Sequence, residues 1–130
     1  MTRPAQLAAA LRNQAQGIYC LQAAAELLIA HATWLHRTDF TGQFITPSHG
    51  LTDGQPMATI DWPAAITALT AGHLPSSGSE QRMLRLIASI AHGIPVDLQQ
   101  TLTGIDDHNI QLLLRAVLHA SGRPPSPHLP

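Results

Sequence analysis

Apolar residues in the first third of the chain recur with a helical period. Between residues 5 and 37 there is no proline, and the strong helix formers Ala, Leu, Gln and Arg dominate. One row of residues, spaced alternately three and four positions apart, has the pattern that two paired helices bury between them. The row consists of Leu11, Gln14, Ile18, Leu21, Ala25, Leu28, Ala32 and Leu35. We therefore predict one long helix over residues 5–37, with Gly17 as a point at which it can break or kink.

Residues 38–60 have a different pattern, in which Thr, Gly, Pro, Asp and Phe replace Ala and Leu. Two short runs favour strands, residues 44–46 and 57–60, and a ten-residue polar stretch with prolines and glycines separates them. We predict a two-stranded hairpin, inserted after the first helix at about residues 44–60. It must pack on the helices, because an isolated hairpin is only marginally stable.

The remaining sequence predicts four shorter helices with recognisable ends. Each begins at a residue whose side chain can cap backbone amides, namely Asp61, Ser77, Asp97 and Asp106, and each is followed by a glycine. The predicted fold class is mainly α, with about five helices in an orthogonal or bundle-like array and the hairpin after the long first helix. Residues 1–121 form a single helical domain in this interpretation, and residues 122–130 a proline-rich flexible tail.

Composition excludes several classes of protein. The 130 residues are 45% hydrophobic, which excludes a disordered chain, and only 12% charged with a net charge of −1, which excludes a strongly basic surface. The single cysteine, Cys20, excludes an internal disulfide framework and a cysteine-based zinc site. No uncharged apolar run is long enough to span a bilayer and no signal-peptide pattern is present, so we predict no membrane contact and a cytoplasmic location. Arginine without lysine is typical of a GC-rich genome.

Nucleic-acid binding is an alternative raised by residues 97–121, which read as a short helix, a glycine turn and a longer helix. In a helix-turn-helix, the start of the second helix contacts base edges. Asp106 and Asp107 lie at that start, and their charge has the wrong sign for a phosphate backbone. A DNA-binding or regulatory protein therefore stays an alternative, and we expect no nucleic-acid partner.

Metal binding and catalysis find little support in the sequence. The densest histidine cluster is His31, His36 and Asp39, but on a helix five residues separate two side chains by about 140°. We predict no metal, no cofactor and no catalytic residues. A small enzyme or a metal- or ligand-binding protein that uses histidines near the hairpin is the second alternative. Its candidate ligand residues are His49, Asp53, Trp34 and Trp62.

The favoured function is a non-catalytic protein-interaction module that binds another protein or, preferentially, a second copy of itself. The low charge leaves few groups to keep exposed apolar surface soluble, and a two-fold dimer is the commonest closed assembly. The predicted interface lies along the long N-terminal helix, at Leu11, Ile18, Leu21, Ala25, Leu28 and Leu35.

Overall fold

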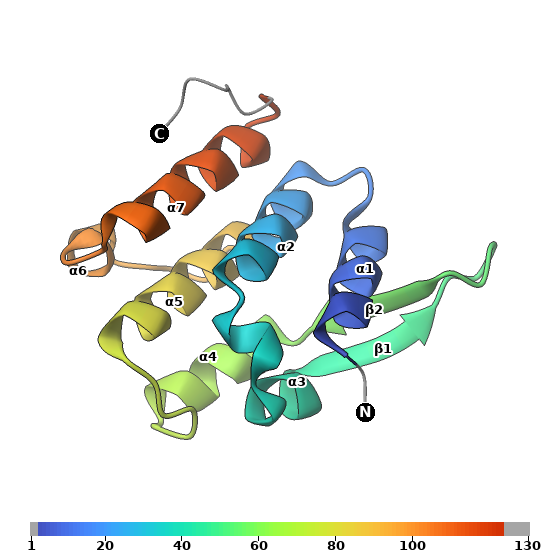
Figure 1. Ribbon diagram of the computed structural model, residues 1–130, viewed down its shortest axis with the longest axis horizontal. Helices are drawn as coiled ribbons and strands as arrows, with labels where there is room; N and C mark the ends of the chain where they lie inside the picture. Colours follow the sequence, from blue (N-terminus) through green and yellow to red (C-terminus); the bar gives the residue numbers. More distant parts are fainter. Residues whose placement is uncertain (1–2, 124–130) are drawn as a thin grey trace.

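The computed structural model describes residues 3–123 and is mainly helical, with one antiparallel hairpin (Figure 1). The mainly α class with a short hairpin is thereby confirmed, whereas the predicted number of helices, about five, is too small. In chain order the elements are α1 (Pro4–Ala15), α2 (Tyr19–His31), the 3-10 helix η1 (Thr33–His36), α3 (Thr38–Phe44), β1 (Ile45–His49), β2 (Pro56–Ile60), α4 (Trp62–Thr70), α5 (Gly78–His92), α6 (Leu98–Leu102) and α7 (Asp107–Ala120). Most of the predicted proline-rich tail, residues 124–130, lies outside the described residues.

The predicted long N-terminal helix is not continuous, and this is the main correction to the sequence-based fold. The helix ends after Ala15, and Gly17 turns the chain with a φ of +84°, a left-handed conformation that glycine adopts without a steric penalty. As a result Arg12 and Glu26 form an ion pair with an Nε–Oε2 distance of 2.8 Å. In a continuous helix these residues would be about 21 Å apart.

Helix α3 was absent from the predicted elements. Its sequence contains Thr, Gly and aromatic residues, which favour helices weakly, so local propensity gave no signal. The helix is held by tertiary packing of Phe40 and Phe44, whose ring centroids are 5.9 Å apart at the i, i+4 spacing of one helix face. Both side chains are buried in the core.

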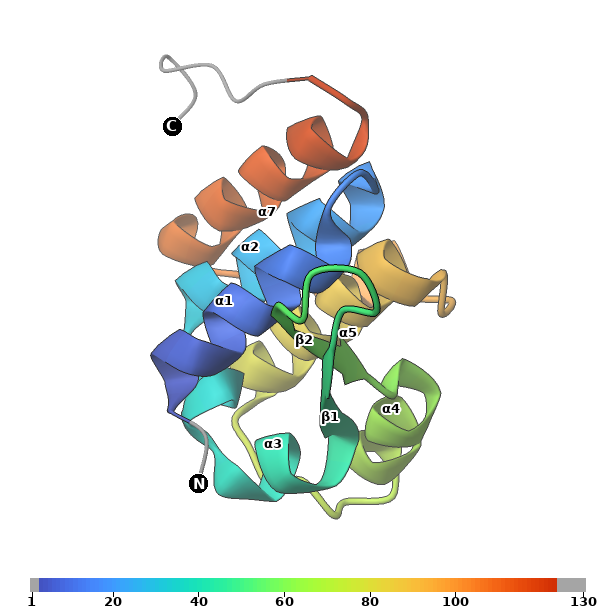
Figure 2. The same cartoon turned by 90° about the vertical axis from the view of Figure 1, so that its right-hand side faces the viewer.

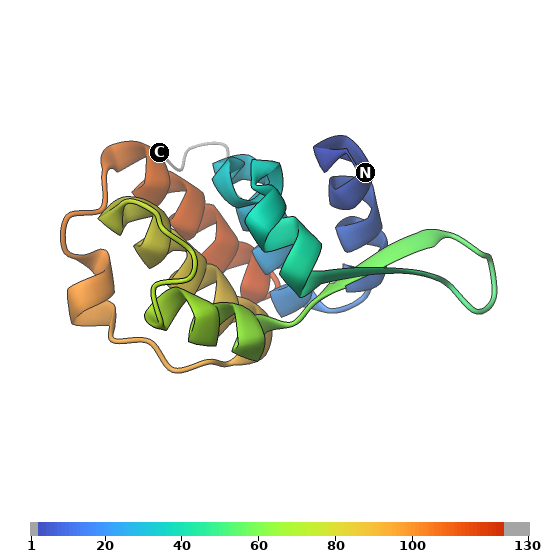
Figure 3. The same ribbon diagram turned by 90° about the horizontal axis from the view of Figure 1, so that it is seen from below.

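The hairpin is confirmed, with different strand boundaries. Ile45 pairs with Ile60 and His49 with Pro56, so β1 is longer than predicted and the connecting loop, residues 50–55, is shorter. Pro47 is tolerated because both strands of a two-stranded sheet are edges, where an N–H can be missing. In Figure 2 the hairpin has α1 and α2 on one side and α3 and α4 on the other. Figure 3 shows it extending beyond the helices, with the loop at its far end.

The predicted starts of the later helices are confirmed. The carboxylates of Asp61, Asp97 and Asp106 accept hydrogen bonds from backbone amides three residues further on, and Ser77 and Glu80 form a reciprocal capping box. These local interactions satisfy amides that have no partner inside a helix. Helix α2 lies between α5 and α7 and contacts both, as expected for the central part of the fold (Figure 1).

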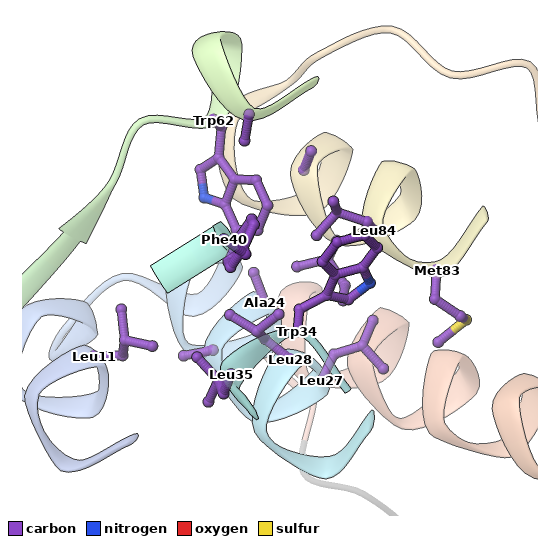
Figure 4. Close-up of a cluster of buried hydrophobic side chains, with 14 of the residues drawn as sticks. Leu11, Ala24, Leu27, Leu28, Trp34, Leu35, Phe40, Trp62, Met83 and Leu84 are labelled. Atoms are coloured by element: carbon purple, nitrogen blue, oxygen red, sulfur yellow. The ribbon is translucent and has the colours of Figure 1, made fainter. Parts of the chain in front are cut away.

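Aromatic side chains form the centre of the core, between the helices and the hairpin (Figure 4). The ring of Phe40 has three aromatic neighbours at centroid distances of 5.5 to 6.3 Å, which are Trp34, Phe44 and Trp62. Such tilted pairs contribute about 0.5–1.5 kcal/mol each beyond their area burial. These four aromatic side chains therefore join the hairpin to the helices.

Candidate binding pocket

A pocket of about 220 Å³ lies where α1, α2, β2, the start of α4 and the end of α5 meet. Its floor is formed by buried residues, namely Ala15, Ala24, Leu28, Ala58 and Trp62. Its sides and mouth are formed by Leu11, Gln14, Leu21, Ala25, Thr59, Ile60, Ala91 and His92. Figure 4 shows Leu11, Ala24, Leu28 and Trp62 of this lining, which come from three different helices.

The lining explains both why the pocket exists and what it can bind. Five of its residues are alanines, whose single methyl groups leave space between the helices and β2. The sequence gives no signal for this pocket, because an alanine-rich helix predicts only that neighbouring helices approach closely. No Asp, Glu or Arg is among the lining residues, and the lining residues with polar side chains are Gln14, Thr59 and His92, apart from the Trp62 indole. An apolar cavity with a few hydrogen-bonding groups is the usual form of a small-molecule site.

The predicted interface residues divide into three groups. Four of them, Leu11, Ala25, Leu28 and Leu35, are buried inside the chain, and the first three also line the pocket. Leu21 is half-buried and lines the pocket, and Ile18, in the turn between α1 and α2, is 52% exposed. Their role in a dimer stays a prediction, but only Ile18 and the accessible part of Leu21 could contact a second copy while the core stays closed.

The structure separates the four predicted ligand residues. His49 and Asp53 do come together, in an exposed groove of about 360 Å³ between the hairpin loop and the end of α1. The Asp53 carboxylate is engaged there, because it accepts a hydrogen bond of 3.0 Å from the Gln55 amide. Trp62 lines the apolar pocket instead. Trp34 is fully buried, and its indole N–H donates to the Glu80 carbonyl oxygen at 3.1 Å.

A polar cluster that sequence reasoning missed surrounds His31 at the end of α2. Its Nδ1 atom is buried and has no hydrogen-bond partner. Burial lowers the pKa of His31, and the nearby carboxylates of Glu80 and Asp106 oppose this shift, while His108 adds to it. No local sequence pattern could indicate this cluster, because its groups come from the ends of three different helices and meet only in the folded chain.

The charged side chain of Arg37 connects several segments near η1. Arg37 donates to Asp39 and, at 2.7 Å, to the Pro75 carbonyl oxygen, and its guanidinium lies 4.7 Å from the Trp34 ring centroid. The hydrogen bond from Arg37 lowers the pKa of Asp39, and in return Asp39 raises the pKa of Arg37. Within residues 3–123, no three His, Cys, Asp or Glu side chains gather closely enough to hold a metal ion.

Six exposed large apolar side chains of the described residues lie on α6, on α7 and at the start of α2. Helix α7 is the outermost helix on one edge of the molecule, with the first turn of α2 beside its end and α6 just before its start (Figure 1). We call this surface the α7 edge and define it by Ile18, Tyr19, Leu98, Leu102, Leu114 and Val117. Leu51, in the hairpin loop, is the remaining exposed large apolar residue of the described part of the chain.

Comparison with protein-family models, with curated proteins and with solved structures found no match. None of the helices within residues 3–123 is long and apolar enough to cross a lipid bilayer.

Proposed function

We propose that this protein is a non-catalytic, cytoplasmic interaction module that forms a two-fold dimer through the α7 edge. The single observation that carries the proposal is the exposure of large apolar side chains on α6 and α7, with Leu98 55%, Leu114 40% and Val117 52% exposed. Exposed apolar residues are common singly, but a contiguous group marks an interaction surface. The row along α1 and α2 that the sequence favoured stays a prediction, and Ile18 is its one member that also belongs to the α7 edge.

The spacing on α7 suits contact with another helix. Ile110, Leu114 and Val117 follow one another at i, i+4 and i+7, which places them on one flank of α7. The opposite flank carries Arg115 and His119, which line a groove with α2. One apolar flank beside one polar flank is the pattern of a helix that pairs with another helix on one side.

Charge favours an antiparallel arrangement of two α7 helices. Asp106 and Asp107 lie at the start of α7, and Arg123 follows its end. Antiparallel pairing brings the acidic start of each helix towards the basic end of its copy and also opposes the two helix dipoles. A two-fold axis perpendicular to the two helices produces this antiparallel arrangement, because each subunit uses the same surface.

Tyr19 extends the apolar surface beyond α7. A Cβ atom placed on Gly122 would lie 3.2 Å from Cε2 of the Tyr19 ring, so the ring covers the chain directly after α7. The ring is 58% exposed and offers a large, rigid apolar face. Tyrosine is enriched at protein interfaces for this reason.

The test is the solution mass of the full chain, measured by light scattering after size exclusion at low micromolar concentration. We expect a species of twice the 13.9 kDa chain mass, and a monomer with unchanged helix content for the double variant Leu114→Glu, Val117→Glu. Thr67→Glu, on the exposed side of α4, is the matched control and should stay dimeric. A monomeric wild-type chain, or a double variant that stays dimeric, contradicts the proposal.

A further inference from the structure

We propose that the pocket between α1, α2 and β2 binds a small uncharged organic molecule with one ring, or a short chain of similar size, and one hydrogen-bonding group. This site is separate from the α7 edge, since no residue of α6 or α7 lines it. The inference is therefore independent of the proposed dimer.

The size of the pocket sets the size of the ligand. The pocket of about 220 Å³ between five elements is much larger than the space that one water molecule needs. An apolar cavity of about 150 Å³ accommodates benzene. The present pocket therefore has room for a six-membered ring with a short substituent.

The depth of the lining residues sets the orientation of the ligand. Leu28, Ala58 and Trp62 at the floor are at most 5% exposed, and they present only carbon surface apart from the Trp62 indole nitrogen. Thr59 and His92 are exposed and stand at the mouth, with the half-buried Gln14 beside them. An apolar ring fits the floor, while a hydroxyl or amide group of the ligand lies at the mouth, where Gln14 and His92 offer hydrogen-bonding side chains.

The lining also selects against charged ligands. No lining residue carries an acidic or guanidinium group, and the imidazole of His92 is the one ionisable side chain among them. An ionised ligand would therefore lose part of its hydration with at most this one side chain to compensate for the loss. Burying an unpaired charge is far more costly than burying a hydroxyl that is hydrogen-bonded. The pocket should therefore distinguish molecules of one shape by their charge alone.

The probe is benzyl alcohol, titrated into the full ¹⁵N-labelled chain and followed by amide chemical shifts. We expect saturable shifts centred on Ala24, Ala58 and Ala91 with a dissociation constant of about millimolar, as suits a ligand of so few atoms. Benzoate and benzylammonium have the same ring and opposite charges. Each should bind at least tenfold more weakly than the alcohol.

Filling the pocket provides the matched variants. Ala91→Leu places a larger side chain in the lining and should weaken binding of benzyl alcohol at least tenfold, and Ala25→Leu does the same from α2 if the first variant perturbs the fold. Ala9→Leu makes the same chemical change at an exposed position of α1 and should leave the binding unchanged. Equal binding of the three probes, shifts spread over the surface, or full binding by both filled variants overturns the proposal.

Discussion

Arg12 on α1 and Glu26 on α2 form a bidentate ion pair, with Nε–Oε2 at 2.8 Å and Nη2–Oε1 at 3.0 Å. The hydrogen bond and the charge of Glu26 raise the pKa of Arg12. The pair connects α1 and α2, which are separate helices that lie side by side. Both of its side chains are about half exposed. Surface pairs of this kind contribute little to stability, so the turn and the core must hold the two helices together.

Removing this pair should therefore change little. We expect Arg12→Gln to lower the free energy of unfolding by less than about 1 kcal/mol, because solvent and salt already screen the two charges. Urea denaturation at low and high salt measures this, and the difference between wild type and variant should shrink with salt. A loss of several kcal/mol would mean that the ion pair, and not the core, positions α1.

Gly17→Ala tests the break between α1 and α2 by the sign of its effect. At the observed φ of +84° an alanine is strained, and we expect a loss of about 1–2 kcal/mol in the free energy of unfolding. In one continuous helix the same substitution would stabilise the protein by about 1 kcal/mol. Thermal and urea unfolding give the sign of the change directly. A variant more stable than the wild type would support one continuous helix over residues 5–37 instead of two.

Ala32→Gly should have the opposite effect to most glycine substitutions. Ala32 ends α2 with a φ of +72°, and it is the one non-glycine residue with positive φ in the described chain. Glycine relieves this conformation, so we expect a gain of about 1 kcal/mol. Ala9→Gly, in the exposed interior of α1, is the matched control and should lose about 1 kcal/mol. Equal losses in both variants would contradict the strain at Ala32.

Trp34→Phe tests the indole side chain that joins η1 to α5. The substitution removes the indole N–H that reaches the Glu80 carbonyl and leaves space beside a fully buried ring. We expect a loss of about 2–4 kcal/mol, from the hydrogen bond and the unfilled volume together. Urea denaturation measures the loss. A change below about 1 kcal/mol would show that neighbouring side chains move into the vacated space and that the hydrogen bond contributes little.

His31 predicts a dependence of stability on pH. Because burial lowers its pKa in the folded chain, the unfolded chain binds the proton more readily, and protonation favours unfolding. The stability that neutral His31 allows is fully present above pH 6.5, the ordinary pKa of histidine. It is lost as the pH falls from there towards the lower pKa of His31 in the folded chain. Glu80 and Asp39, whose pKa values are lowered, lose their contributions only in the more acidic range of carboxylates.

The variant His31→Phe removes this titration and the unpartnered Nδ1 atom. We expect the difference in unfolding free energy between about pH 7.5 and pH 5.5 to be smaller in the variant than in the wild type. Urea denaturation at the two pH values measures it. An equal or larger difference in the variant would assign the pH dependence to other groups.

Local chemistry made several elements predictable from the sequence. The caps at Asp61, Asp97 and Asp106 and the box formed by Ser77 and Glu80 depend on residues within three positions of each other. The hairpin was predictable for a similar reason, because strand-favouring runs and turn residues are short-range signals. The mainly helical class followed from the spacing of apolar residues.

Tertiary structure decided the rest, because contacts distant in sequence compete with local preference. The spacing of apolar residues is the same for one long helix and for two that fold back, so it could not show that the chain turns at Gly17. Phe40 and Phe44 form α3 through neighbours in other elements. The apolar pocket exists because alanines of α1, α2, β2 and α5 meet, and no local pattern encodes the empty volume between helices that are far apart in the sequence.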